Sequence, residues 1–599
     1  MSINGPQLSQ RPRPTQPQPV APKYPVMIPL ESPRKRIRFT TIIFLLIMSL
    51  YATRLVEIQI VRGPELAVNA QNSRIQTLLL PALRGGFTDR NGVPIATTIL
   101  ARNVTVDPKL ITDPVGTAAA LSPILGIDQD KIIESLTIDS RFSYVAKRIT
   151  PETWKRVAEL GIPGVFSEPT TNRAYPNGTL AASIVGYVGA EGSGLGGLEF
   201  GLNKQLSGED GKLTVERVNG REIPASERQS IDPVNGLSVR LTIDADLQAT
   251  LERSLQDQIL ATGAEGGVAV VVEPGTGNIL ALATYPTFDP NDPFASSDHD
   301  KRNSAVTDVF EPGSTSKVMT MAAVIEEGGA GPETPYLVPN RISRGGTSFK
   351  DYNEHGDLQL TLNGVLAKSS NIGTILASET IGEKTFYKYL QKFGIGESTG
   401  MNFPGESAGS LPNIEDENQW SDTTFPTLAF GQGLSVNVVQ AASVFATIAN
   451  DGIRMKPRLI SGYSNSQGVF EPTVLSEGQR VVSAETAKTV REMLESVVSE
   501  DGTARSLQIP GYRVAGKTGT ANRYDQTTGG YNGYTSSFIG MAPAENPAFV
   551  MAISVHNPKT STYGSVVAGP VFKTAMTYAL ANNKVPPSTS KPPKLPVEW

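Results

Sequence analysis

The strongest constraint on how this chain can fold is one uncharged, largely apolar run near its start, from Phe39 to Thr53. The run has about 15 residues, a little short of the ~20 that a membrane-spanning helix usually needs. Arg54 can reach back to the interface, and residues 55–60 continue an apolar face. A basic cluster at residues 34–38 precedes the run, and this favours an anchor whose N-terminus is inside. We therefore predict a single-pass transmembrane anchor at residues 39–60, with everything after residue 60 outside the cytoplasm.

Two alternatives to an anchor stay open. A cleaved signal peptide would require a small-residue cleavage site after the run, and no good A-x-A site is present there. A buried helix of a soluble domain is the other alternative, but the basic cluster on one side favours the uncleaved anchor.

Both ends of the chain are rich in proline. Proline recurs throughout residues 1–38, between glutamines and arginines that cannot build a core, so this stretch is predicted to be a disordered cytoplasmic tail. A docking segment for a cytoplasmic partner is the alternative. Residues 586–599 are predicted to be a second disordered tail.

Residues 61–235 alternate short β-rich runs with helical stretches and read as a scaffold. Asn91-Gly92 is a strong signal for a tight turn between two strands. The glycines at 192–197 lack the strand, loop and following lysine of a phosphate-binding loop, so a flexible loop that opens a helix is preferred.

A second domain is predicted at residues 236–585. Leu237–Ile243 has a strand pattern, and Asp244 can cap a following helix that continues through Ile259. Hairpin patterns occur at 268–283 and at 535–555, with long helical stretches between them. We therefore expect an α+β, multidomain protein with a central antiparallel β-sheet covered by helices.

The composition excludes several kinds of site. The 599 residues include no cysteine, which rules out disulfides, thiolate catalysis and zinc–cysteine centres. Only three histidines are present, so a histidine-rich metal centre is not expected, and a Ser-His-Asp triad would have to use His299, His355 or His556. The net charge of −5 gives no indication of nucleic-acid binding.

The first chemical motif is Ser314-Thr315-Ser316-Lys317. Pro312-Gly313 ends the preceding structure, so Ser314 should lie near a helix N-terminus, and Lys317 three residues later should share its face. An ordinary lysine, with a pKa of about 10.4, is protonated at neutral pH. Burial and a second cation, for which Lys517 is the candidate, would lower the Lys317 pKa enough for it to act as a base. In isolation this string is equally that of a serine N-cap followed by an exposed lysine.

Two further strings support the first. Ser369-Ser370-Asn371 offers a proton relay and an amide, although alone it reads as a polar turn. Lys517-Thr518-Gly519-Thr520 reads as a strand with a cation, two hydroxyls and a glycine that admits a ligand, although a strand without a ligand fits as well. The three strings together, in this order, indicate acyl transfer without histidine.

With these motifs the chain resembles the class B penicillin-binding proteins, the monofunctional transpeptidases, over residues 39–585. Supporting matches are at 84–92, 173–176, 196–201 and 431–435. The second motif ends in Asn371, as in division-type members, where elongation-type relatives often carry aspartate. The sequences at residues 430–435 and 449–452 resemble those of actinobacterial members. No departure occurs within the three core motifs.

The resemblance implies roles for the motif residues. Ser314 would attack the penultimate D-alanine of a D-Ala-D-Ala stem peptide, with Lys317 as base, Ser369 as proton relay and Asn371 positioning the peptide. Lys517, Thr518, Gly519 and Thr520 would face the donor's carboxylate, with the backbone N–H groups of Ser314 and Thr520 as the oxyanion hole. An amine of a second stem would close a septal cross-link. β-Lactam antibiotics would mimic the donor and stay on Ser314.

The resemblance implies no metal or organic cofactor. It also implies that residues 61–235 form a pedestal, related to the dimerisation-type domain, that contacts partners, and that a polytopic SEDS-type glycosyltransferase and other division proteins of the cytoplasmic membrane are those partners. Two rivals stay open: a hydrolase on the same motifs, either a D,D-carboxypeptidase or a β-lactamase, and a non-catalytic β-lactam sensor or division scaffold. The acceptor amine and the oligomeric state are not given by the sequence.

Overall fold

The computed structural model describes residues 33–72, 75–218, 221–222, 229–525 and 530–599. The chain divides into two compact units, one of residues 1–78 and 214–229 and one of residues 79–213 and 230–599. Each unit is described by itself. The larger unit contains most of both regions that the sequence separates at residues 235 and 236.

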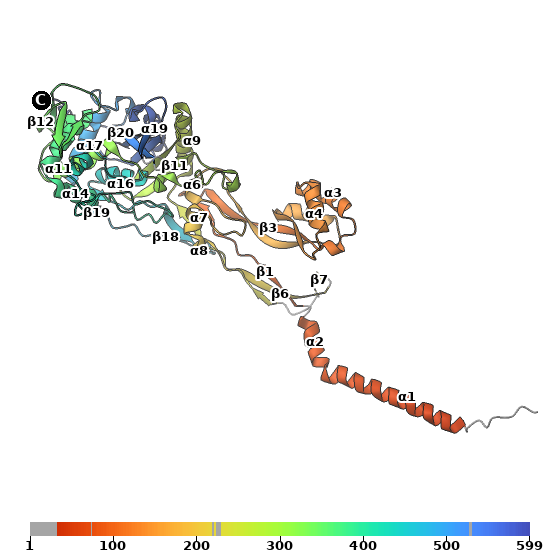
Figure 1. Cartoon of the computed structure of the whole chain (residues 1–599). Helices are drawn as coiled ribbons and strands as arrows, with labels where there is room; N and C mark the ends of the chain where they lie inside the picture. The colour runs from red at the N-terminus through yellow and green to blue at the C-terminus, as the bar shows by residue number, and fades with distance from the viewer. Residues whose placement is uncertain (1–32, 73–74, 219–220, 223–228, 526–529) are drawn as a thin grey trace, which may run out of the picture. The chain divides into compact units, whose positions relative to one another are not determined.

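The smaller unit begins with the apolar helix. α1 (Pro33–Val56) continues into a π-helical turn, η1 (Glu57–Val61), and α2 (Gly63–Asn72) follows (Figure 1). The 28-residue helix Arg34–Val61 contains an 18-residue window with a mean hydropathy of 1.9, and it is long and apolar enough to cross a membrane. Residues 33–38 were expected in the disordered tail but belong to this helix, because a proline at its start is pre-organised for the first turn. The rest of the predicted tail, residues 1–32, lies outside the described residues.

A small sheet accounts for most of the remaining described residues of this unit. Its strands are ordered β1 (Ile75–Leu80), β6 (Gly211–Val218) and β7 (Arg221–Glu222), and β8 (Gln229–Ile231) also pairs with β6.

In the larger unit, a seven-stranded sheet joins two regions that are far apart in sequence. Its order is β18 (Phe470–Pro472), β17 (Ile460–Ser464), β9 (Ser238–Leu241), β2 (Phe87–Thr88), β3 (Pro94–Val106) and β4 (Ser143–Ile149), and β5 (Val165–Ala174) also pairs with β3. β9 runs parallel to β2, with Phe87 opposite Val239. The strand predicted at 237–243 therefore belongs to this sheet and not to the central sheet of the 236–585 region.

Three helices build a separate core on part of this sheet. They are α3 (Pro114–Leu125), α4 (Gln129–Thr137) and α5 (Pro151–Glu159). Their apolar faces, with Leu121, Ile132 and Val157 buried, cover Val104 and Val106 of β3. Aspartate, aspartate and threonine side chains cap the three N-termini in turn.

The core of the 236–585 region is a five-stranded sheet in which every pair of neighbouring strands is antiparallel. Its order is β11 (Asn278–Tyr285), β10 (Gly266–Glu273), β22 (Phe549–His556), β21 (Gly530–Ala542) and β20 (Ala515–Asp525). This confirms the two predicted hairpins. β10 and β22 are buried along nearly their whole length, so both faces of the sheet are covered.

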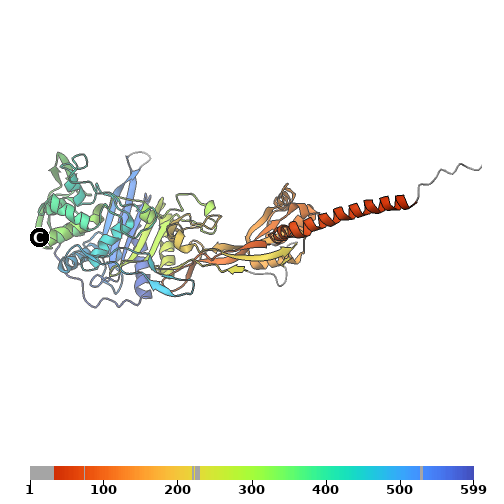
Figure 2. The ribbon, with the colours of Figure 1, turned by 90° about the horizontal axis from the view of Figure 1, so that it is seen from below.

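Helices supply that cover. α9 (Ala245–Thr262) packs on β11 and against α19 (Gly569–Asn582), while α16 (Val438–Ala449) packs on β10 and β22 (Figure 1). Asp244 caps α9 by accepting from the Leu247 N–H, as predicted. The blue arrows of β20 to β22 lie beside the green and cyan helical segment, from which α17 (Ala484–Val498) packs on β20 (Figure 2). The α+β class and the helix-covered antiparallel sheet predicted from the sequence are confirmed.

The C-terminal stretch is ordered, which corrects the prediction of a disordered tail at 586–599. The Thr361 hydroxyl donates to the Pro596 carbonyl at 2.6 Å, and the Thr361 N–H donates to the Val597 carbonyl at 3.1 Å. A Cβ on Gly364 would lie 1.8 Å from the Val597 carbonyl oxygen, so this glycine allows the close approach. We call residues 595–599 the C-terminal strap. It lies on α12 (Leu362–Lys368), which ends directly before Ser369.

Candidate active site

Ser314 lies on a short 3₁₀ turn that the surrounding backbone holds tightly. The turn, η4 (Gly313–Ser316), leads into α11 (Lys317–Glu326), so Ser314 is at a helical N-terminus as predicted. Gly313 has φ +53° and donates its N–H to the Gly431 carbonyl at 2.9 Å. Gly431 itself has φ +89°, and a Cβ there would lie 2.1 Å from the Gly313 carbonyl oxygen. Both glycines are therefore required for the turn that presents the Ser314 hydroxyl.

Lys317 is the first residue of α11 and is fully buried. Its Nζ donates to the Asn371 Oδ1 at 2.8 Å, to the Ser369 carbonyl at 2.5 Å and to the Ser369 Oγ at 3.3 Å. Burial lowers the pKa of Lys317 to about 7, against the opposing charge of Asp351. Between these described residues no hydrogen bond joins Lys317 Nζ to the Ser314 hydroxyl, although the two residues share a helical turn as expected.

Lys517 is the second buried lysine, and its amine also contacts Ser369. Its Nζ donates to the Ser369 Oγ at 2.9 Å and to the Thr518 carbonyl at 3.2 Å. Burial, with the positive charge of Lys317 as a second cause, lowers the pKa of Lys517 well below its ordinary range. A proton on Lys317 therefore disfavours a proton on Lys517.

The second motif is the junction between two helices. Ser369 ends α12 with φ +64°, a left-handed conformation that is rare for serine, and this turns its side chain toward the two lysines. Ser370 is the N-cap of α13 (Asn371–Glu379) and accepts from the Gly373 N–H at 2.9 Å. The two serines therefore have different roles. Ser369 faces the two lysines, and Ser370 caps the N-terminus of α13.

The third motif lies on β20, which runs directly against the η4 turn. A Cβ on Gly519 would lie 3.1 Å from the Pro312 carbonyl oxygen and 3.0 Å from Thr315, so glycine permits this contact. The Thr518 hydroxyl lies 3.1 Å from the Thr503 hydroxyl. The Thr520 hydroxyl donates to the Thr562 carbonyl at 2.8 Å, so in this state only its acceptor sites are available to a ligand.

Asp351 organises the site and was missed by the sequence analysis. Its carboxylate accepts from the backbone N–H of Asn371 at 2.5 Å and of Ile372 at 2.9 Å, and from the Ser370 hydroxyl at 2.7 Å. His355 contacts the same carboxylate at 3.1 Å through Nε2. Because the carboxylate stands between the histidine and Ser370, this group is not a Ser-His-Asp triad. No sequence pattern links Asp351 to Ser370, since the contact forms only when the loop that carries Asp351 folds back onto the start of α13.

Replacing Asp351 by alanine is expected to loosen the start of α13. Three donors lose their acceptor, and loss of a helix cap costs about 0.5–2 kcal/mol. We expect the midpoint of urea unfolding to fall and the Asn371 and Ile372 amides to exchange with solvent faster. Asp357→Ala, an exposed aspartate of the same loop, is the control. Equal exchange of the two amides in both variants would contradict the capping role of Asp351.

Taken together, the predicted residues Ser314, Lys317, Ser369, Asn371, Lys517, Thr518, Gly519 and Thr520 come from four elements and the structure gathers them around Ser369 and β20. The arrangement places the Ser369 hydroxyl between two amines whose pKa values burial lowers, in the group of residues to which the Ser314 turn belongs. Among the described residues, no cluster of three or more histidine, aspartate or glutamate side chains is placed to hold a metal ion.

Comparison with known proteins gives matches along most of the chain. The model of the penicillin binding protein transpeptidase domain matches residues 267–577, and that of the penicillin-binding protein dimerisation domain matches residues 79–241. The chain is 35% identical to penicillin-binding protein PbpB of Mycolicibacterium smegmatis, over 94% of this chain and 92% of that protein. It is 31% identical to peptidoglycan D,D-transpeptidase FtsI of Escherichia coli K12, over 91% of each. The crystal structure of penicillin binding protein 3 from Mycobacterium tuberculosis, complexed with aztreonam, superposes with a TM-score of 0.69 at 34% identity, covering 87% of this chain and 100% of that one.

Proposed function

Since this chain belongs to the class B penicillin-binding proteins, of the division type found in actinobacteria, we propose that Ser314 is the nucleophile of its transpeptidase reaction. The chain is a septal peptidoglycan D,D-transpeptidase, a serine acyltransferase that acts on peptidoglycan and binds β-lactams. The observation that carries the assignment of residues is the Ser369 hydroxyl, which lies between two buried lysines next to the Ser314 turn.

The first half of the reaction is acylation. The Ser314 Oγ attacks the carbonyl carbon of the penultimate D-alanine, and its proton passes to the neutral Lys317 amine, whose pKa of about 7 leaves a large fraction unprotonated at neutral pH. The tetrahedral intermediate expels the terminal D-alanine, which takes a proton as the amide bond breaks. An ester on Ser314 remains.

Ser369 and Lys517 are assigned the transfer of the proton to the amine of the departing D-alanine. The Ser369 Oγ lies 2.9 Å from Lys517 Nζ and 3.3 Å from Lys317 Nζ, so one hydroxyl can pass a proton from the base toward the leaving nitrogen. In the second half, an amine of another stem attacks the ester carbonyl and loses a proton to the base. The new amide is the cross-link, and Ser314 regains its proton.

Binding of the donor is assigned to β20 and Asn371. The Thr518 and Thr520 hydroxyls are offered to the terminal carboxylate, whereas the absence of a side chain at Gly519 serves the close packing of β20 against Pro312 and Ser537. Because Thr520 donates to Thr562 in the structure, its hydroxyl must rotate when the carboxylate binds. Asn371 accepts from Lys317 through Oδ1 and donates through Nδ2 to the Lys350 carbonyl at 3.1 Å, so one amide N–H is left for the peptide backbone.

The protein is membrane-bound through its N-terminal helix, and we assign it one span with the N-terminus in the cytoplasm. The support is the basic cluster at residues 34–38, which immediately precedes the apolar run. The catalytic region then lies outside, where peptidoglycan is. A polytopic SEDS-type glycosyltransferase and other division proteins are the proposed partners, because the matched domains are one transpeptidase and one dimerisation domain, whose family implies a separate glycan polymerase.

Mapping a penicillin adduct tests the assignment. The full chain in detergent is incubated with penicillin, its intact mass is measured, and the digested protein is sequenced by fragment ions. We expect one stable adduct, placed on Ser314. Placement on Ser316 or Ser369 would overturn the assignment of the nucleophile. Consumption of penicillin without an adduct would favour the hydrolase alternative, and an unmodified, unconsumed mixture would favour the sensor or scaffold.

A further inference from the structure

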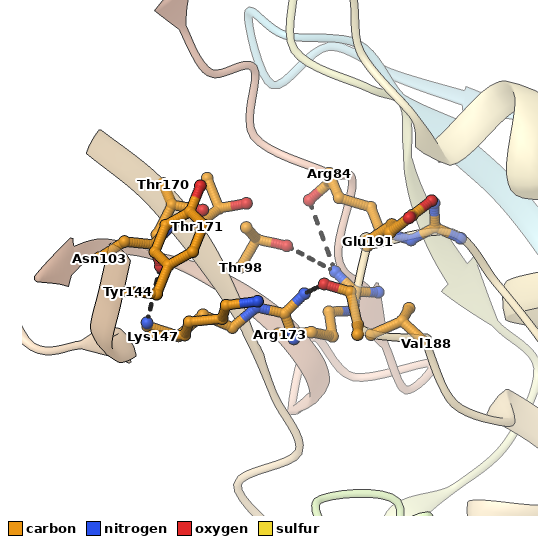
Figure 3. A pocket seen from close by; sticks show the side chains of 13 residues that line it. Arg84, Thr98, Asn103, Tyr144, Lys147, Thr170, Thr171, Arg173, Val188 and Glu191 are labelled. Atoms are coloured by element: carbon orange, nitrogen blue, oxygen red, sulfur yellow. Dashed lines mark hydrogen bonds between the residues drawn. The ribbon is translucent and has the colours of Figure 1, made fainter. Parts of the chain in front are cut away.

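A second pocket, remote in sequence from the motif residues, lies in the 79–213 part of the larger unit. It is a cavity of about 270 Å³ between β3, β4, β5 and residues 188–192 (Figure 3). Its volume is far above the ~30 Å³ of a water molecule and approaches the ~300 Å³ of small ligand sites. None of the catalytic residues lines it. Two motifs that the transpeptidase reaction does not use, the ones containing Arg84 and Arg173, meet here.

The inner wall of the pocket holds an arginine that is not fully paired. The Arg173 side chain is 4% exposed, and its Nε donates to the Glu199 Oε1 at 2.7 Å. Its Nη1 donates to the Gly85 carbonyl at 2.8 Å and to the Thr98 hydroxyl at 2.9 Å, whereas its Nη2 is buried without a partner among the described residues. This buried Nη2 carries positive charge behind the wall of the pocket, and that charge adds to the potential inside the cavity.

The rim adds two more cations. Lys147 extends from β4 over the Tyr144 ring, 4.6 Å from its centroid. Arg148, the next residue, donates through Nη2 to the Gly189 carbonyl at 3.4 Å and to that of Ala190, which fixes the 188–192 segment as a wall. In Figure 3 Lys147 and Tyr144 lie at one side of the cavity and Arg173 at its centre.

The charges of the pocket do not cancel. Four basic side chains, Arg84, Lys147, Arg148 and Arg173, line it. Two carboxylates oppose them: Glu191 in the lining and Glu199, which bridges Arg84 and Arg173 from behind. Two positive charges are therefore left over, and the lining threonines supply hydroxyl donors around them.

From this geometry we infer that the pocket is a binding site for a doubly charged oxyanion of the phosphate class. Arginine and lysine with hydroxyl donors form charge-assisted hydrogen bonds to phosphate oxygens, and a phosphate monoester carries −1.5 to −2 at neutral pH. Such a group neutralises the two excess charges, whereas a diester, with one charge, leaves one uncompensated. The site is separate from acyl transfer, and its occupant can be a free anion or the end group of a larger molecule.

Calorimetric titration of the full chain in detergent, in phosphate-free buffer at low salt, tests the site. The probes are inorganic phosphate, glycerol phosphate, malonate and dimethyl phosphate. We expect inorganic phosphate to bind with a dissociation constant below about 1 mM, and dimethyl phosphate to bind at least about tenfold more weakly. Glycerol phosphate binding as well as phosphate would indicate an esterified end group, and exclusion of the ester would indicate a free anion. Malonate binding as tightly as phosphate would overturn the phosphate class.

Two rim substitutions should change the affinity in opposite directions. Lys147→Gln removes a cation and should weaken phosphate binding about tenfold, while Glu191→Gln removes the opposing carboxylate and should strengthen it. Lys155→Gln, an exposed lysine on α5 outside the pocket, is the matched control and should stay within about twofold of the wild type. Equal weakening by Lys147→Gln and Lys155→Gln, or no binding at about 10 mM phosphate, would overturn the site.

Discussion

Replacing Lys317 by alanine is expected to lower the rate constant for penicillin acylation of Ser314 by about 10²–10⁴-fold, the usual contribution of a general base. Lys317 is fully buried, and its lowered pKa is what makes it a base near neutral pH. Stopped-flow acylation with a fluorescent penicillin gives the rate constant, and Ser314→Ala defines the zero. Lys368→Ala is the matched control, since Lys368 is exposed and lies one residue before Ser369.

The pH profile gives an independent reading of the same group. Only the unprotonated amine can accept the Ser314 proton, so the acylation rate should rise as pH increases through about 7 and then level off. An unperturbed lysine would keep the rate rising toward its ordinary pKa of about 10.4. A Lys317→Ala variant that stays within threefold of Lys368→Ala, or a wild-type profile flat from pH 5 to 9, would remove Lys317 from the role of base.

The second large effect is expected on stability. Glu199 is fully buried and bridges two arginines: its Oε2 accepts from Arg84 Nε at 2.6 Å and its Oε1 from Arg173 Nε at 2.7 Å. Glu199→Ala would leave two guanidinium groups buried with no countercharge between them. Breaking a buried ion pair by removing one partner costs about 3–5 kcal/mol. We therefore expect a marked loss of stability.

Urea unfolding followed by tryptophan fluorescence measures that loss. Glu209→Ala, an exposed glutamate ten positions later in the chain, controls for removal of a carboxylate as such. An unfolding midpoint for Glu199→Ala within error of that for Glu209→Ala would mean that the arginines find other acceptors and that the bridge is not what holds these segments together.

The sequence was sufficient for features that depend on neighbouring residues. The spacing of Ser314 and Lys317 predicts a shared helical turn, and Asp244 predicts the start of α9, because both depend on contacts within one turn. The two hairpins follow from alternating apolar residues and turn residues between them. The gathering of the three motifs was predicted from their chemistry and from resemblance.

Contacts between segments that are far apart in sequence were not predicted. Asp351 reaches the Asn371 N–H across a loop, and β9 pairs with Phe87 about 150 residues earlier, neither of which leaves a periodic signal. The prediction of disorder at residues 586–599 was wrong. A proline-rich composition predicts that a segment forms no helix or strand by itself, but it says nothing about whether the segment binds to the surface of a folded domain. Thr361 and Gly364 provide that surface.

The C-terminal strap has a consequence for where Ser369 is held. Its carbonyls at Pro596 and Val597 receive the Thr361 hydroxyl and N–H at the start of α12, the helix whose end sets the position of Ser369. The Thr361–Pro596 contact joins segments that are 235 residues apart, so the position of α12 depends on docking of the strap. Removing the strap would therefore act on where Ser369 is held and not on the chemistry of its hydroxyl.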